Sequence, residues 1–169
     1  MDATELVISE PAKPELLVGC DLPPPVVAAL TTGFQIKGPG EDVQAQFTAG
    51  AKPDALLISV ESRLDQAFVA KLPESVRVVA TFSVGTDHLD IPALKARGIR
   101  VLNTPDVLSN AVAETAVFLT LGVARRAVES TELIRSGKWQ GWTASQLIGF
   151  ELHGRTAGIV GMGRIGREI

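Results

Sequence analysis

From Glu15 onward the chain alternates short apolar runs with amphipathic stretches. Five of these runs are rich in Val, Ile and Leu, which is typical of strands that are buried on both faces of a sheet. They cover residues 16–19, 34–37, 55–60, 76–81 and 99–103. The hydrophobic pattern therefore predicts five short buried strands.

Four amphipathic stretches separate these strands, and we expect each to form a helix. They cover residues 26–30, 41–49, 64–72 and 91–97, the last with Pro92 in its first turn and Gly98 after its end. Strands and helices that alternate in this way predict an α/β fold, a flavodoxin-like sandwich around a parallel sheet with right-handed crossovers. Ligands of such sheets bind beyond the carboxyl ends of the strands, which points to the loops at 20–23, 60–63 and 83–88.

The pattern changes after Asn103. Ser109 or Asn110 can cap a long helix that runs to about residue 136, with Gly137 behind its C-terminus. Such a helix would be roughly 40 Å long, enough to connect two domains. We expect a further strand at 156–160, a tight turn at Gly161 and the start of another helix behind it. Residues 1–14 are predicted to be a loose lead-in.

Composition narrows the classes of protein that the chain can belong to. It has 169 residues, of which 46% are hydrophobic and 21% charged, and the net charge is −3, as in an ordinary globular protein. Basic and acidic residues are interspersed, so we do not expect nucleic-acid binding. The most apolar stretch, 111–124, is interrupted by Glu114 and is too short to span a membrane, so we do not expect insertion into one. Cys20 is the only cysteine, and the N-terminus lacks the pattern of a signal peptide, so the cytoplasm is the expected compartment.

The motif Gly161-Met-Gly-Arg-Ile-Gly166 follows the last predicted strand. In this context G-x-G-x-x-G predicts a dinucleotide site: Gly161 permits the tight turn, Gly163 the close approach of a pyrophosphate, and Gly166 the packing of helix against strand. The alternative is glycine packing at an ordinary turn between a strand and a helix.

The segment Thr81-Phe-Ser-Val-Gly-Thr-Asp-His88 lies just past a buried strand. Gly85 could free the backbone so that the amides near Val84 and Gly85 point at one anion, with each charge-assisted hydrogen bond contributing about 1.5–3 kcal/mol. The alternative is a plain turn in which Asp87 caps the following helix. The residues alone leave both interpretations open.

Five motifs in order resemble one enzyme family. They are Ser83-Val-Gly-Thr-Asp-His-Leu-Asp90, Val101-Leu-Asn-Thr-Pro-Asp-Val-Leu108, Val112-Ala-Glu114, Ser136-Gly-Lys-Trp139 and Gly161-Met-Gly-Arg-Ile-Gly166. Together they resemble the D-isomer-specific 2-hydroxyacid dehydrogenases, in particular the glyoxylate/hydroxypyruvate reductase branch, and hydroxyphenylpyruvate reductases share the same blocks. The resemblance covers nearly the whole chain from about Glu15.

The resemblance implies a role for several positions. The amides of Val84 and Gly85 would bind the substrate carboxylate, and Ser59 and Val60 would line the same site. On the cofactor side, Val112 would lie near the nicotinamide and the glycine turn would bind the pyrophosphate; the residues implied are Val112, Gly161, Gly163, Arg164, Ile165 and Gly166. The resemblance divides the chain into a substrate-binding domain at 15–105 and, at 106–169, the linking helix with an incomplete Rossmann domain for NAD(P).

For the full-length protein the resemblance implies reduction of a small 2-oxo acid by NADPH or NADH, with NADPH favoured, and a homodimer. The Arg, Glu and His that the family uses for catalysis have no counterpart in this sequence, so we expect this stretch alone to be inactive and His88 not to be catalytic. A non-catalytic binding protein of the corepressor type, which shares the dehydrogenase architecture, is the alternative. No Cys, His or Asp spacing suggests a metal site.

Overall fold

The computed structural model describes residues 12–38, 40 and 42–169. Its contacts divide the chain into two compact units, Met1–Pro105 and Asp106–Ile169, which are described separately below. Most of the predicted lead-in (residues 1–11) and the first residue of the helix predicted at 41–49 lie outside the described residues, whereas residues 12–14 have no regular secondary structure.

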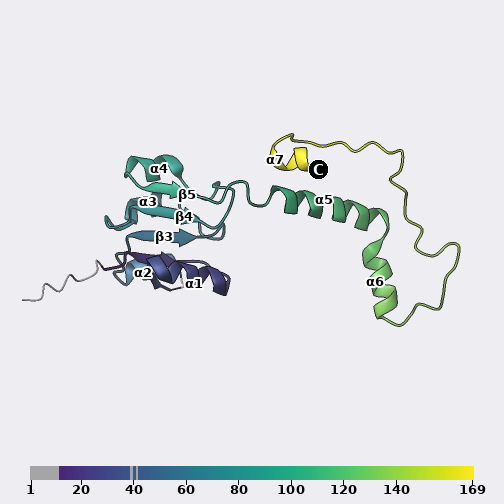
Figure 1. Ribbon diagram of the computed structural model, residues 1–169, viewed down its shortest axis with the longest axis horizontal. Coiled ribbons are helices and arrows are strands. Elements are labelled where there is room, and N and C mark those ends of the chain that lie inside the picture. Colours follow the sequence, from purple (N-terminus) through teal and green to yellow (C-terminus); the bar gives the residue numbers. More distant parts are fainter. Residues whose placement is uncertain (1–11, 39, 41) are drawn as a thin grey trace, which may run out of the picture. The chain divides into compact units, whose positions relative to one another are not determined.

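The first unit is built on a five-stranded parallel sheet in the order β2-β1-β3-β4-β5. In Figure 1 the arrows of β3, β4 and β5 all point the same way. This is the order of flavodoxin-like folds, so the predicted fold class is confirmed. Each observed strand lies within or next to a predicted run: β1 Glu15–Val18, β2 Gln35–Lys37, β3 Ala55–Ile58, β4 Val78–Thr81 and β5 Arg100–Leu102.

The four predicted helices of this unit are also present. They are α1 Pro24–Gly33, α2 Val43–Thr48, α3 Gln66–Lys71 and α4 Ile91–Ala96. Aspartates begin three of them, because the carboxylates of Asp42, Asp65 and Asp90 accept a hydrogen bond from a backbone amide in the first turn. In α4 Pro92 stands in the first turn, and Gly98 follows with φ +71°, as the sequence predicts.

Alternate residues of the strands are buried against opposite layers of helices. Leu17, Leu56 and Val79 belong to the larger buried cluster, which includes side chains of α2, α3 and α4. Leu16 and Val18 face the smaller cluster, against which Leu30 of α1 packs. Because successive side chains are buried on opposite faces, the strands at 15–18, 55–58 and 78–81 are held rigidly from both sides. The loops at their carboxyl ends therefore start from fixed points.

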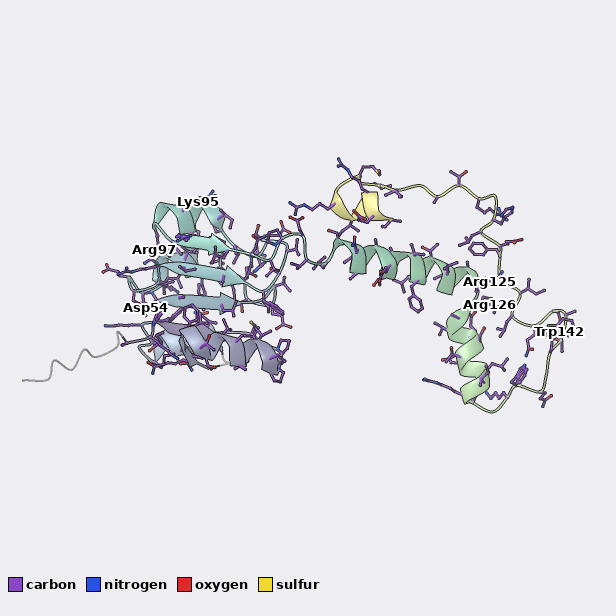
Figure 2. The ribbon with its side chains drawn as sticks, viewed as in Figure 1. Asp54, Lys95, Arg97, Arg125, Arg126 and Trp142 are labelled. Carbon is purple, nitrogen blue, oxygen red and sulfur yellow. The ribbon has the colours of Figure 1, made fainter. Side chains whose placement is uncertain are left out.

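The second unit contains three helices, α5 Ser109–Ala124, α6 Ala127–Arg135 and α7 Arg164–Glu168. The prediction of one continuous helix to residue 136 is wrong, because Arg126 adopts a left-handed conformation (φ 54°, ψ 45°) between α5 and α6. Figure 2 shows Arg125 and Arg126 at this break. The carbonyl of Ala124 accepts a hydrogen bond from the amide of Phe150 at 3.0 Å instead of continuing the helix.

Two further predictions for this unit are wrong. Neither Ser109 nor Asn110 caps α5, since its cap position is Leu108 and no side chain bonds the free amides there. Residues 156–160 form no strand. A strand needs a neighbour for its amides and carbonyls, and the described residues of this unit contain no other strand. In the described part of the chain, no helix combines the length and apolarity that crossing a membrane requires.

Candidate functional site

Two neighbouring loops form the carboxyl edge of the sheet at β3 and β4. The loop after β3 begins at Ser59 and the loop after β4 begins at Phe82, whose amide donates to the carbonyl of Ile58 at 2.7 Å. Both loops end at one short bridge, in which the amide of Leu64 donates to the carbonyl of His88 and the amide of Asp90 to that of Leu64, each at 2.8 Å. The two loops are therefore fixed to each other at both ends.

Three successive carbonyls of the loop after β4 are held by donors from the protein. The carbonyl of Ser83 accepts from the amide of Thr104 at 3.0 Å, and that of Val84 from Nδ2 of Asn103 at 2.9 Å. The carbonyl of Gly85 accepts from Oγ of Ser83 at 2.7 Å. These peptide bonds are trans, and in a trans peptide the N–H points opposite to the C=O.

The amides of Val84, Gly85 and Thr86 therefore point away from the groups that hold their carbonyls. Among the hydrogen bonds of the described residues, none is donated by these three amides. Unpaired backbone amides of this kind can bind an anion. The φ of Gly85 lies outside the left-handed region. What the glycine leaves is space, because the only atom within 4 Å of a Cβ built there is Oδ2 of Asp87, at 3.6 Å.

The other two predicted substrate residues come from the adjacent loop. The side chain of Val60 is 62% exposed. Ser59 stabilises the turn, because its carbonyl accepts from the amide of Ser62 at 3.2 Å and its Oγ lies 3.4 Å from the amide of Glu61. The strand order brings Ser59 and Val60 to the same edge of the sheet as Val84 and Gly85.

His88 is half-buried and contacts the buried end of β4. Its Nε2 lies 2.9 Å from Oγ1 of Thr81, a side chain that is only 2% exposed. Burial lowers the pKa of His88, and the nearby carboxylate of Asp87 opposes this shift. The alternative in which Asp87 caps the next helix is wrong, because Asp90 caps α4 by accepting from the amide of Ala93 at 2.9 Å.

In the second unit, the three glycines of the G-x-G-x-x-G motif have different surroundings. Gly161 has φ +102°, a conformation that side chains disfavour. Gly166 is buried, and a Cβ there would overlap the carbonyl oxygen of Gly161. Gly163 stands at the N-terminus of α7, and no atom lies within 4 Å of a Cβ built on it. Gly161 thus stands in the tight turn that the motif predicts, and Gly166 packs against the backbone of that turn and not against a strand.

The other predicted cofactor residues lie in α5 and α7. Arg164 and Ile165 form the first turn of α7, and Nε of Arg164 pairs with Oδ1 of Asp106 at 2.8 Å, with both side chains exposed. Val112 lies in the first turn of α5 and is 37% exposed. A groove of about 560 Å³ runs along α5, but none of the predicted cofactor residues lines it. The described residues contain no group of three metal-ligating side chains.

A parallel flavodoxin-like sheet with free amides at its carboxyl edge, followed by a G-x-G-x-x-G turn, is an arrangement that many α/β dehydrogenases share. The family model of the D-isomer specific 2-hydroxyacid dehydrogenase catalytic domain matches residues 29–151. The chain belongs to this family.

Individual relatives agree with the family. The chain is 35% identical to a glycerate dehydrogenase of Hyphomicrobium methylovorum over 94% of this chain and 50% of the relative. It is 36% identical to a glyoxylate/hydroxypyruvate reductase B of Yersinia enterocolitica over 93% of this chain and 49% of that relative. The solved structure of an NADPH-dependent glyoxylate/hydroxypyruvate reductase from Sinorhizobium meliloti, in complex with NADP and malonate, has a TM-score of 0.76 at 32% identity over 93% of this chain and 49% of that one. The chain spans about half the length of these relatives.

The sequence did not indicate which residues hold the loop at 83–86. Asn103 and Thr104 act from the end of β5, and Asn103 is 19 residues from Val84. The sequence indicates only that the segment around residue 84 and the segment around residue 103 each follow a predicted strand. Whether the two segments meet depends on the order of those strands in the sheet.

Proposed function

We propose that this chain is part of an enzyme that reduces a small 2-oxo acid of the glyoxylate or hydroxypyruvate type to the 2-hydroxy acid, with NADPH or NADH as the reductant. The observation that carries the proposal is the loop at 83–86, where three carbonyls are held by the protein and three amides are left without a partner. A carboxylate is the group that all 2-oxo acids share, and unpaired amides fixed by a rigid sheet suit it.

In this proposal the amides of Val84 and Gly85 bind the carboxylate, and Ser59 and Val60 border the same edge. The turn from Gly161 to Gly166, with Arg164 and Ile165, holds the diphosphate of the cofactor, and Val112 lies near the nicotinamide. The bound cofactor supplies the hydride. The residues of this chain therefore bind and orient the two reactants, which is a large part of catalysis in itself.

NADPH is the proposed preference. Its support is the relative from Sinorhizobium meliloti, which is an NADPH-dependent enzyme. The corepressor-type alternative has no comparable support, because the relatives above are dehydrogenases and reductases.

The complete gene product, incubated with NADPH or NADH and with glyoxylate, hydroxypyruvate or hydroxyphenylpyruvate, tests the proposal. We expect oxidation of NADPH with at least one of the two smaller acids. Gly163→Ala should weaken cofactor binding, because the added methyl group takes the space left for a phosphate. Gly33→Ala is the matched control, since Gly33 also has no atom within 4 Å of a built Cβ but lies in α1. Cofactor binding without turnover of any of the acids would favour the corepressor-type alternative.

We also propose that the protein acts in the cytoplasm as a homodimer that uses the region of α5. Phe118, Leu119 and Val123 support the dimer, because they are 69%, 56% and 73% exposed and large apolar surfaces usually meet a partner. Light scattering should give a dimer for the complete gene product and a monomer for Phe118→Glu. A monomeric wild type would contradict this.

A further inference from the structure

A chain of side-chain hydrogen bonds runs from His88 to the substrate loop. Nε2 of His88 lies 2.9 Å from Oγ1 of Thr81, which lies 2.7 Å from Oγ of Ser83, which in turn donates to the carbonyl of Gly85 at 2.7 Å. Thr81, at the centre of this chain of bonds, is almost completely buried. The proposed function assigns no role to Thr81, Ser83 or His88.

The direction of this chain follows from counting protons. The carbonyl of Gly85 only accepts, so Ser83 uses its single hydroxyl proton there. Ser83 must then accept from Thr81, which has no second proton to give to His88. Nε2 of His88 is therefore the donor to Oγ1 of Thr81, and the proton of a neutral His88 lies on Nε2 and not on Nδ1.

We propose that His88, Thr81 and Ser83, together with Asn103, are positioning residues that orient the peptides of residues 84–86 for binding a carboxylate. The inference rests on the proposed function of the loop and extends it to side chains that do not touch the substrate. The first three residues hold the carbonyl of Gly85, and with it the amide of Thr86, which we add to the amides of Val84 and Gly85 as a third ligand of the carboxylate. Asn103 holds the carbonyl of Val84, and with it the amide of Gly85.

The bonds act on the amides in two ways. Each fixes a peptide plane before the ligand arrives, so the orientation is not lost to loop motion on binding. Each also polarises its carbonyl, and hydrogen bonds in series strengthen one another. Burial lowers the pKa of His88, which favours the neutral imidazole over its charged form. A carboxylate at this loop therefore meets amides whose opposite ends are already bonded.

Thr81→Val, Thr81→Ser and Asn103→Leu test the proposal in the full 169-residue chain. Valine keeps the shape of threonine without the hydroxyl, and serine restores the hydroxyl. Thr48→Val is the matched control, because Oγ1 of Thr48 also makes a hydrogen bond, at 2.9 Å to the carbonyl of Gln44, but on α2. The probe is oxalate, a small stable dicarboxylate, followed through the amide NMR signals of Gly85 and Thr86.

We expect oxalate to shift these amide signals in the wild type. Thr81→Val and Asn103→Leu should each raise the dissociation constant by about fivefold to tenfold, the effect of losing one ordinary hydrogen bond, whereas Thr81→Ser and Thr48→Val should leave it within about twofold. If Thr81→Val is too unstable to measure, Ser83→Ala interrupts the same chain at a less buried residue and should raise the constant equally. The ¹⁵N shifts of His88 should show a neutral ring protonated on Nε2, as the direction of the hydrogen-bond chain requires.

Two failures are distinguishable. If oxalate shifts neither amide of the wild type, the proposed function of the loop is wrong, and this inference falls with it. If oxalate binds the wild type and the variants equally, or if His88 carries its proton on Nδ1, the loop binds carboxylates but these side chains do not position it.

Discussion

Replacing Gly85 with alanine separates the stability of the substrate loop from its capacity to bind a carboxylate. The φ of Gly85 is not left-handed, and the nearest atom to a Cβ built there is an oxygen of Asp87 at 3.6 Å, an ordinary van der Waals distance. The fold can therefore accept the methyl group. Alanine restricts the unfolded chain, so the free energy of unfolding should rise by about 0.4–1 kcal/mol.

Binding should change in the opposite direction. The methyl group lies on the residue whose amide we propose as a ligand of the carboxylate, and it occupies space that is open in this structure. The loss of one charge-assisted hydrogen bond weakens the free energy of binding by about 1.5–3 kcal/mol. This loss raises the dissociation constant of oxalate or glyoxylate by about 10- to 150-fold.

Urea unfolding and oxalate titration of the same two samples measure both effects. Gly50→Ala is the control, because Gly50 also has open surroundings but has φ +89°. It should lose about 1 kcal/mol or more of stability and bind oxalate like the wild type. A Gly85→Ala chain that binds oxalate with unchanged affinity would refute the assignment of this amide. A Gly85→Ala chain with a clearly lower free energy of unfolding would refute the inference that the fold has space for a methyl group at residue 85.

Three further predictions concern the first unit. Leu94 of α4 is fully buried in the main core, so Leu94→Ala should lower the free energy of unfolding in urea by about 2–5 kcal/mol, whereas Lys95→Ala at the next, exposed position of the same helix should change it by about 0.5 kcal/mol or less. Cys20 is 3% exposed and burial raises the pKa of its thiol, with the carboxylates of Asp21 and Glu61 adding to the shift; a disulfide reagent should therefore react far more slowly with the folded chain than with the chain in urea, and equal rates would contradict this burial. Burial lowers the pKa of His88 below its ordinary value of 6.5. As the pH falls past 6.5, His88 of the unfolded chain is therefore protonated before His88 of the folded chain. The free energy of unfolding decreases until the pH is below the pKa of His88 in the folded chain. Thermal unfolding between about pH 5 and 8 should show a shallower decrease for His88→Gln, and an unchanged slope would contradict this.

The sheet of the first unit could be predicted because its signals are local. Runs of apolar residues mark strands that are buried on both faces, and the aspartates before α2, α3 and α4 mark where helices begin. Strand ends were less predictable. Residues 59 and 60 continue an apolar run, yet β3 ends at Ile58, because a strand extends only as far as its neighbours pair with it.

The candidate substrate loop could be predicted only in part, for a related reason. The residues Ser83 to His88 identify a glycine-containing loop after a strand, and the family resemblance assigns amides to a carboxylate. What holds those amides in place comes from elsewhere in the chain, because Asn103 and Thr104 reach the loop from the end of β5. Such contacts depend on the order of strands in the sheet, which the spacing of apolar residues does not contain.

The second unit shows the same distinction within a few residues. The apolar residues Ile159 and Val160 predict a strand, but a strand forms only when a second segment pairs with it. Here Val160 is completely exposed and belongs to no strand. The glycine turn that follows is nevertheless formed. Two of its contacts are local: Gly166 packs against the backbone of Gly161, and Nε of Arg167 donates to the carbonyl of Met162 at 3.2 Å. A third comes from outside the turn, because Arg164 pairs with Asp106 just before α5. The turn proposed for the diphosphate therefore forms without a paired strand before it.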